Sequence, residues 1–234
     1  MTAGVVHDVA TSQGRSRLHC FAAVADVAGG RDSQGARGTV LLGHGAGGGV
    51  DAEDLAALTA LTQRGWVVVL LEQPWRVAGR RIAVAPPRLD EATEQMLAAV
   101  AGLTEAPRPW VLGGRSAGAR VACRLRAHAQ ALCLLAFPLT PPQRGTRAQA
   151  PRTEELLAPV RDRIPTLVLQ GRGDRFGGPM DIADAVDVAL PPVEATSPRD
   201  TELLRVRGYP GDHGPSRDLG LVVEEAGSFL DALP

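Results

Sequence analysis

The sequence predicts an α/β fold in which a mostly parallel sheet is covered by helices on both faces, with little or no lid. Short apolar runs alternate along the chain with segments of helical periodicity, a pattern typical of parallel strands joined by crossover helices. Glycine-rich or polar turns follow several of these runs. The segment 137–164, rich in proline and arginine, is too short for a large lid domain.

The expected elements follow from these runs in order. The stretch 18–27 is expected to be an antiparallel strand, with 29–38 as its turn. Further strands are expected at 39–43, 66–71, 109–113, 131–136, 165–170 and 201–207. Helices are expected at about 51–63, where Gly65 supplies the cap, at 89–102, after residue 116, at 179–189 and at 219–233. We expect one domain over residues 1–234, with a core of about 18–234.

Composition limits the classes of function. The chain has 234 residues, 44% of them hydrophobic, and a formal net charge of −1, so no nucleic-acid partner is expected. All 25 basic residues are arginine, which is typical of a GC-rich bacterial genome. The N-terminus lacks an apolar signal core, and no run is long enough to span a bilayer. The three cysteines match neither a zinc site nor a disulfide framework, so a reduced, cytoplasmic protein is expected. The motifs described below imply no metal or organic cofactor.

The stretch 111–120 carries the strongest functional signal. It reads as a short apolar strand, then Gly-x-Ser-x-Gly from Gly114 to Gly118, then an alanine-rich helix. In a nucleophile elbow a serine lies on a tight turn between strand and helix, where close backbone leaves no room for a neighbouring Cβ. Ser116 is therefore the candidate nucleophile, and the N–H of Ala117 is a candidate oxyanion donor.

A serine nucleophile needs a base, and the base needs an acid to orient it. In this architecture the acid and then the histidine follow the serine, each after a strand. His213 lies in a turn-rich loop after the expected strand 201–207, whereas His128 falls within the elbow helix. Asp174 follows the expected strand 165–170. It is favoured as the acid over Asp212, which adjoins His213 and cannot easily turn back to its ring.

The first parallel strand is followed by the glycine-rich loop 43–49, with a His-Gly-x-Gly pattern. Such a loop supplies the second oxyanion donor, here the N–H of Ala46. In such a loop the ring of His44 is expected to bond backbone and hold the turn. The same glycines also fit a dinucleotide fingerprint, with Glu72 near the position of a ribose-binding acid. The carboxylates at Asp51, Glu53 and Asp54 argue against it, because they would repel a pyrophosphate at the start of the next helix.

Four further residues are candidates for substrate binding. Arg115 is expected to bind an anionic group, or to be solvated or paired with Glu72. Trp75, Phe137 and Phe176 follow strand ends, so they are expected either to wall a pocket or to pack in the core.

The chain resembles an α/β hydrolase of the dienelactone-hydrolase-like kind. More narrowly, it is similar to the small family related to a testis-expressed mammalian protein and to a subunit of the non-specific-lethal chromatin complex. The matching stretches are 43–48, 113–120, 137–142, 152–156 and 212–213. The resemblance implies a triad of Ser116, Asp174 and His213. Ala117 departs from it, because these proteins often have a methionine there, and 72–75 is a loose version of their aromatic-proline segment.

These patterns together predict a serine hydrolase that cleaves an ester or thioester of a small molecule. A non-catalytic binding or scaffold protein on the same fold is the alternative, since fold does not fix function. A dinucleotide-binding protein is the third. The acyl group, the leaving group and the oligomeric state do not follow from the sequence.

Overall fold

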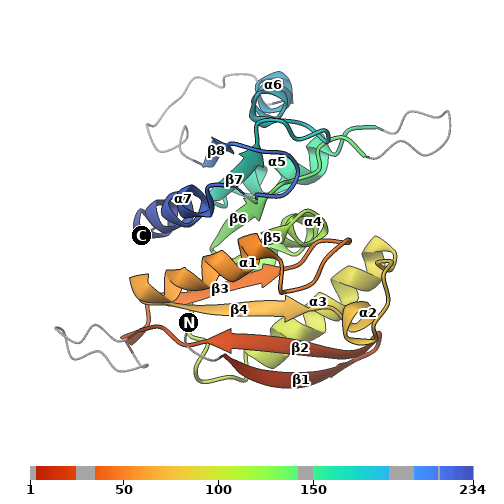
Figure 1. Cartoon of the computed structure of the whole chain (residues 1–234), viewed down its shortest axis with the longest axis vertical. Helices are drawn as coiled ribbons and strands as arrows, with labels where there is room; N and C mark the ends of the chain where they lie inside the picture. The colour runs from red at the N-terminus through yellow and green to blue at the C-terminus, as the bar shows by residue number, and fades with distance from the viewer. Residues whose placement is uncertain (1–3, 25–34, 142–149, 190–202, 216, 234) are drawn as a thin grey trace.

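The computed structural model describes residues 4–24, 35–141, 150–189, 203–215 and 217–233. Its centre is a sheet of eight strands in the order β1-β2-β4-β3-β5-β6-β7-β8 (Figure 1). β1 and β2 are antiparallel to their neighbours, and the remaining strands are parallel. The strands are β1 Val5–Thr11, β2 Gly14–Phe21, β3 Gly38–Gly43, β4 Trp66–Glu72, β5 Trp110–Arg115, β6 Ala131–Leu135, β7 Thr166–Gly171 and β8 Leu204–Tyr209.

Helices cover both faces of this sheet (Figure 1). One hydrophobic cluster receives side chains of α1 and α7, and the other receives side chains of α3, α4, α5 and α6. The helices are α1 Glu53–Leu58, α2 Pro74–Val77, α3 Pro86–Val100, α4 Ala117–Arg124, α5 Thr153–Arg161, α6 Pro179–Ala189 and α7 Leu219–Asp231, with 3₁₀ turns at Thr59–Arg64 and Arg126–His128.

The central strands separate the two clusters because successive side chains of a strand point to opposite faces. In β3, Leu41 packs in one cluster, while Val40 and Leu42 pack in the other. A strand buried on both faces is apolar along its whole length, which is why these strands stand out in the sequence. The expected α/β fold is confirmed, and the described residues form no separate lid.

Most expected elements agree with the structure to within three residues at each end. The elbow helix is shorter than expected, because α4 ends at Arg124 and His128 lies in the 3₁₀ turn that follows it. The strand expected at 18–27 begins earlier, at Gly14, and ends at Phe21; residues 25–34, with much of the expected turn, lie outside the described part. β1, α2 and α5 were not expected. Gly65 ends the 3₁₀ turn after α1 in the left-handed conformation, as expected.

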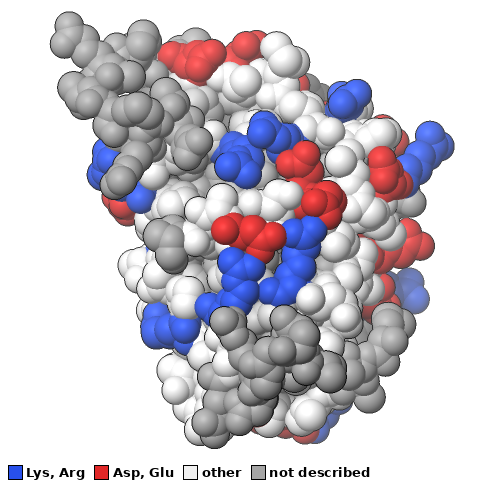
Figure 2. Space-filling view, turned by 90° about the vertical axis from the view of Figure 1, so that its left-hand side faces the viewer, with Lys and Arg blue, Asp and Glu red and all other residues white. Residues whose placement is uncertain are grey.

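The surface drawn in Figure 2 carries arginine and acidic side chains next to one another. Ion pairs join two arginines to the final helix. Arg37, before β3, and Arg64, before β4, both contact Asp231, and Arg64 also contacts Glu224. Exposed pairs of this kind contribute little to stability individually. Among the described residues, no helix has the length and apolar character that crossing a membrane requires.

Candidate active site

The sharp turn between β5 and α4 gives Ser116 its position. Ser116 has φ 53° and ψ −102°, a strained conformation for a residue with a side chain. A Cβ on Gly114 or on Gly118 would lie 2.2 Å from the carbonyl oxygen of Gly43. The two glycines of the Gly-x-Ser-x-Gly pattern are therefore required by close contact with the end of β3, as the pattern predicts.

Three side chains from separate strand ends meet at this turn. The Oγ of Ser116 lies 2.9 Å from Nε2 of His213, and Nδ1 of the same ring lies 2.8 Å from Oδ2 of Asp174. Ser116 follows β5, Asp174 follows β7 and His213 follows β8. Because β5 to β8 are parallel, these loops share one edge of the sheet.

The carboxylate of Asp174 is held by three donors, and its side chain is fully buried. Its Oδ2 also accepts a hydrogen bond from Nε2 of Gln170 at 2.8 Å, and its Oδ1 accepts one from the N–H of Phe176 at 2.8 Å. Asp212, the other candidate acid, is exposed to solvent, and the ring of His213 contacts Asp174. Sequence reasoning did not single out Gln170; its place on β7, four residues before Asp174, is the signal that could have found it.

The two expected oxyanion donors line the same cleft as Ser116 and His213. The N–H of Ala117 is the first of helix α4, and the first amides of a helix have no partner within the helix. Ala46 lies on the exposed turn after β3. Close contact between Gly43 and Gly118 brings this turn against the elbow.

His44 anchors the glycine-rich loop through its ring. Its Nε2 accepts a hydrogen bond from the N–H of Gln73 at 3.1 Å, so Nδ1 carries the proton and donates to the carbonyl of Gly45 at 3.0 Å. Burial lowers the pKa of the imidazole, which favours this neutral form. The expectation that His44 holds the loop by bonding backbone is confirmed.

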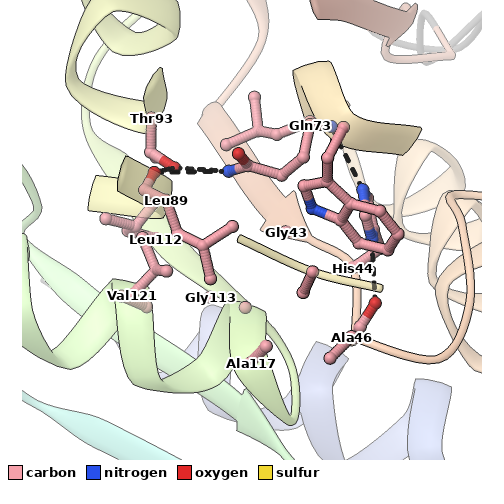
Figure 3. A pocket seen from close by; sticks show the side chains of 16 residues that line it. Gly43, His44, Ala46, Gln73, Leu89, Thr93, Leu112, Gly113, Ala117 and Val121 are labelled. Carbon is pink, nitrogen blue, oxygen red and sulfur yellow. Dashed lines mark hydrogen bonds between the residues drawn. The ribbon is translucent and has the colours of Figure 1, made fainter. Parts of the chain in front are cut away.

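A small cavity of about 20 Å³ lies behind this loop (Figure 3). Gln73 points across it towards Thr93, and Ala46 and Ala117 lie at its other side (Figure 3). A volume of this size suits about one water molecule and not an acyl chain. Two polar atoms on its lining residues, Oε1 of Gln73 and Nε1 of Trp75, have no hydrogen-bond partner among the described residues.

Arg115 lines the cleft but is not paired with Glu72. Its Nε lies 3.3 Å from Oδ2 of Asp54, a residue of α1 that is 2% exposed. Burial raises the pKa of Asp54, and the charge of Arg115 opposes that rise. Asp54 lies in the first turn of α1, as expected, and its side chain is buried beside Arg115. Glu72 instead contacts His19 and Arg17.

The three aromatic candidates have different environments. Phe176 lines the cleft and makes an edge contact with the His213 ring, at 4.7 Å between centroids. Trp75 is buried, lies on the wall of the cavity of Figure 3 and contacts His44 edge-on at 5.3 Å. Phe137 is fully buried in the core and is not among the residues that line the cleft or the cavity. Phe137 therefore packs in the core and does not form part of a pocket wall.

The cleft itself has a volume of about 410 Å³, within the range of small-molecule sites. Its lining includes Ser116, His213, Phe176, both candidate oxyanion donors and three arginines. Within the part of the chain that the structure describes, no three histidine, cysteine or acidic residues are grouped so that they could hold a metal ion. The chemistry available at this site is that of a hydroxyl, an imidazole, a carboxylate and backbone amides.

Comparison with known proteins identifies the family of the chain. Residues 36–195 match a family described as the alpha/beta hydrolase domain, and this match covers more than half of the chain. The chain belongs to the α/β hydrolase family. The family match ends before His213, so the assignment of His213 to the site rests on the geometry described above.

Solved structures share the fold at low sequence identity. An α/β serine hydrolase without lid from Xanthomonas campestris is 18% identical, with a TM-score of 0.67 and coverage of 100% of this chain and 98% of that one. An α/β serine hydrolase homologue from Coxiella burnetii is 15% identical, with a TM-score of 0.68 and coverage of 100% and 99%. Est1E from Butyrivibrio proteoclasticus, bound to ferulic acid, is 12% identical, with a TM-score of 0.68 and coverage of 97% and 98%. The comparison with curated proteins gave no significant match.

Proposed function

We propose that this α/β hydrolase is a serine hydrolase that cleaves an ester or thioester of a small molecule through an acyl-enzyme. One observation carries the proposal: the ring of His213 lies within hydrogen-bond distance of Ser116 on one side and of Asp174 on the other. A nucleophile, a base and an orienting acid in this geometry form the triad of acyl-transfer enzymes.

The direction of proton transfer follows from the hydrogen bonds. The ionised carboxylate of Asp174 can only accept, so Nδ1 of His213 carries the proton and Nε2 offers its lone pair to the hydroxyl of Ser116. As Oγ attacks the carbonyl carbon, His213 takes the hydroxyl proton and then gives it to the leaving group. A water molecule, activated by the same ring, then releases the acyl group from Ser116.

The developing negative charge needs donors. We assign this role to the N–H groups of Ala46 and Ala117, and loss of one such donor typically costs about 3 kcal/mol of transition-state stabilisation. The site as described needs neither a metal nor an organic cofactor for this reaction. The partner that the site implies is the ester or thioester itself.

Within the superfamily, we propose that the chain is dienelactone-hydrolase-like and related to the testis-expressed and non-specific-lethal-complex proteins. The stretches 43–48 and 113–120 support this, because they form the loop after β3 and the elbow. We also propose a cytoplasmic location, which the three free, buried cysteines support.

Labelling with a fluorophosphonate probe tests the proposed chemistry without knowledge of the substrate. The probe should modify Ser116, and Ser116→Ala should abolish the labelling while the far-ultraviolet circular dichroism stays unchanged. A panel of esters and thioesters of varied chain length then identifies the acyl preference. A folded protein that is neither labelled nor active would favour the scaffold alternative, and a saturable rise in melting temperature with NAD or NADP would favour nucleotide binding.

A further inference from the structure

The cleft beside Ser116 is lined by three guanidinium groups and by no acidic side chain among its described lining residues. Arg115, Arg120 and Arg152 lie on it together with Ser116 and His213. Arginines at a cleft with no acidic lining create a positive potential towards which anions are attracted. Whether a positive charge is available depends on what already balances each arginine.

Two of the three arginines are balanced within the protein. Arg115 is paired with the buried Asp54. Arg120 donates from Nε to Glu155 at 2.7 Å. Glu155 also contacts Arg124, which is in turn held by Asp90 through two hydrogen bonds of 2.7 Å. Arg120 and Arg124 therefore share the carboxylates of Glu155 and Asp90.

Among the described residues, no carboxylate forms an ion pair with Arg152. Its one hydrogen bond from the side chain to a described residue runs from Nη1 to the carbonyl of Pro138, at 2.9 Å, and none of the ion pairs among the described residues includes it. Burial and the nearby charge of Arg120 lower the pKa of its guanidinium, against an opposing effect of Glu155. A partly desolvated cation beside a second cation is unfavourable unless an anion approaches it.

The position of this charge relates it to the reacting atoms. Arg120 lies one turn along α4 from Ser116, because its N–H bonds to the carbonyl of Ser116 at 3.1 Å. Arg152 immediately precedes α5 and lines the same cleft. An anionic group bound by these two guanidiniums would lie in the same cleft as Ser116. It could therefore belong to the same small molecule whose ester carbonyl is attacked there.

We propose that Arg152, assisted by Arg120, binds a carboxylate of the substrate, so that the preferred ester or thioester is anionic. This inference rests on the proposed hydrolase function and specifies its substrate class. Guanidinium groups bind carboxylates through charge-assisted, often bidentate hydrogen bonds. Such bonds are stronger than neutral ones.

Matched esters test the proposal. In the first arm, para-nitrophenyl hemiglutarate carries a carboxylate on the acyl side and para-nitrophenyl valerate is its neutral counterpart. In the second arm, para-acetoxybenzoate carries the charge on the leaving group, and its methyl ester is neutral. In at least one arm the wild type should prefer the anionic ester, and Arg152→Gln should lower the anionic-to-neutral ratio of kcat/KM by about tenfold or more.

The variants separate a binding role from a structural one. Arg152→Lys retains the charge and a donor for the carbonyl of Pro138, so it should recover part of the preference through KM. Arg161→Gln removes an equal charge from the last turn of α5, at an exposed ion pair with Glu154, and it should leave the ratio unchanged. The preference should also weaken in high salt.

Two outcomes overturn the inference while leaving the hydrolase function intact. One is a wild type that shows no preference for either anionic ester, and the other is an Arg152→Gln variant whose ratio changes no more than that of Arg161→Gln. Absence of both labelling and turnover would instead refute the hydrolase function. Calorimetric titration with glutarate then tests separately whether the cleft binds a carboxylate. If the wild type and Arg152→Gln bound glutarate equally, or if neither bound it, the proposed anion site would be refuted.

Discussion

The identity of the triad acid offers the sharpest test. Asp174 and Asp212 were both candidates, and the structure brings Asp174 into contact with His213. The side chain of Asp174 is fully buried and accepts hydrogen bonds from His213, Gln170 and Phe176, each at 2.8 Å. An asparagine has one acceptor oxygen, so it cannot satisfy all three donors in the same geometry. It also lacks the negative charge that stabilises the imidazolium formed during attack.

The expected losses differ between catalysis and stability. In serine proteases of the chymotrypsin type, replacing the triad acid by asparagine lowers kcat by about 10⁴, equivalent to about 5.5 kcal/mol. For Asp174→Asn we expect a loss of about 10³ to 10⁴ in kcat/KM by the same loss of tautomer control. One unsatisfied donor costs about 1–3 kcal/mol of stability, so the melting temperature should fall by several degrees.

The assay follows ester turnover and the rate of fluorophosphonate labelling, with Asp212→Asn as the control. Asp212 is exposed, so its replacement should change either rate by less than about threefold, as expected for a surface substitution. If Asp212→Asn were the costlier change, or if Asp174→Asn kept more than about a tenth of the activity, the assignment of the acid to the end of β7 would be wrong.

Two further predictions concern the loops that support the site. Gly118→Ala places a Cβ 2.2 Å from the carbonyl oxygen at the end of β3, so urea denaturation should show that the free energy of unfolding falls by more than about 3 kcal/mol. Gly48→Ala is the control, because its Cβ would meet nothing within 4 Å, and it should be close to neutral. Equal losses in the two variants would contradict the packing argument. Burial lowers the pKa of His44 in the folded protein. Below a pH of about 6.5 the unfolded chain therefore binds a proton at this imidazole more readily than the folded protein does. This contribution to stability should be present above that pH and should be lost as the pH falls below it. In His44→Gln this part of the pH dependence should disappear, and an unchanged slope between pH of about 8 and 5.5 would exclude the buried imidazole as its source.

The sequence predicted those elements that are buried on both faces. β3, β5 and β7 are continuous apolar runs, so pattern alone identifies them. β1 is an edge strand with alternating exposed positions, and His7 and Asp8 interrupt its apolar residues, so no continuous apolar run marks it. α5 lies in a segment rich in proline and arginine and contains Pro159. Proline usually argues against a helix interior, so the helix was not expected.

The candidate site was predictable to the extent that each residue follows a strand. The order of serine, acid and histidine along the chain places all three at one edge of a parallel sheet. Contacts between distant residues have no such marker. Asp54 and Arg115 are separated by a strand, two helices and their loops, and neither shows in sequence that the other will be its partner.

Close backbone contact at the elbow explains why the site depends on packing as much as on its polar groups. A Cβ on Gly114 or on Gly118 would lie only 2.2 Å from the carbonyl oxygen of Gly43, so the end of β3 contacts both sides of the turn that carries Ser116. The glycine-rich loop begins at this contact, and His44 fastens it to the backbone after β4 through the N–H of Gln73. Both candidate oxyanion donors are therefore positioned by one contact between neighbouring strands. A substitution that separates β3 from the elbow should displace the donors of Ala46 and Ala117 relative to each other, and it should lower turnover even where Ser116, Asp174 and His213 are intact.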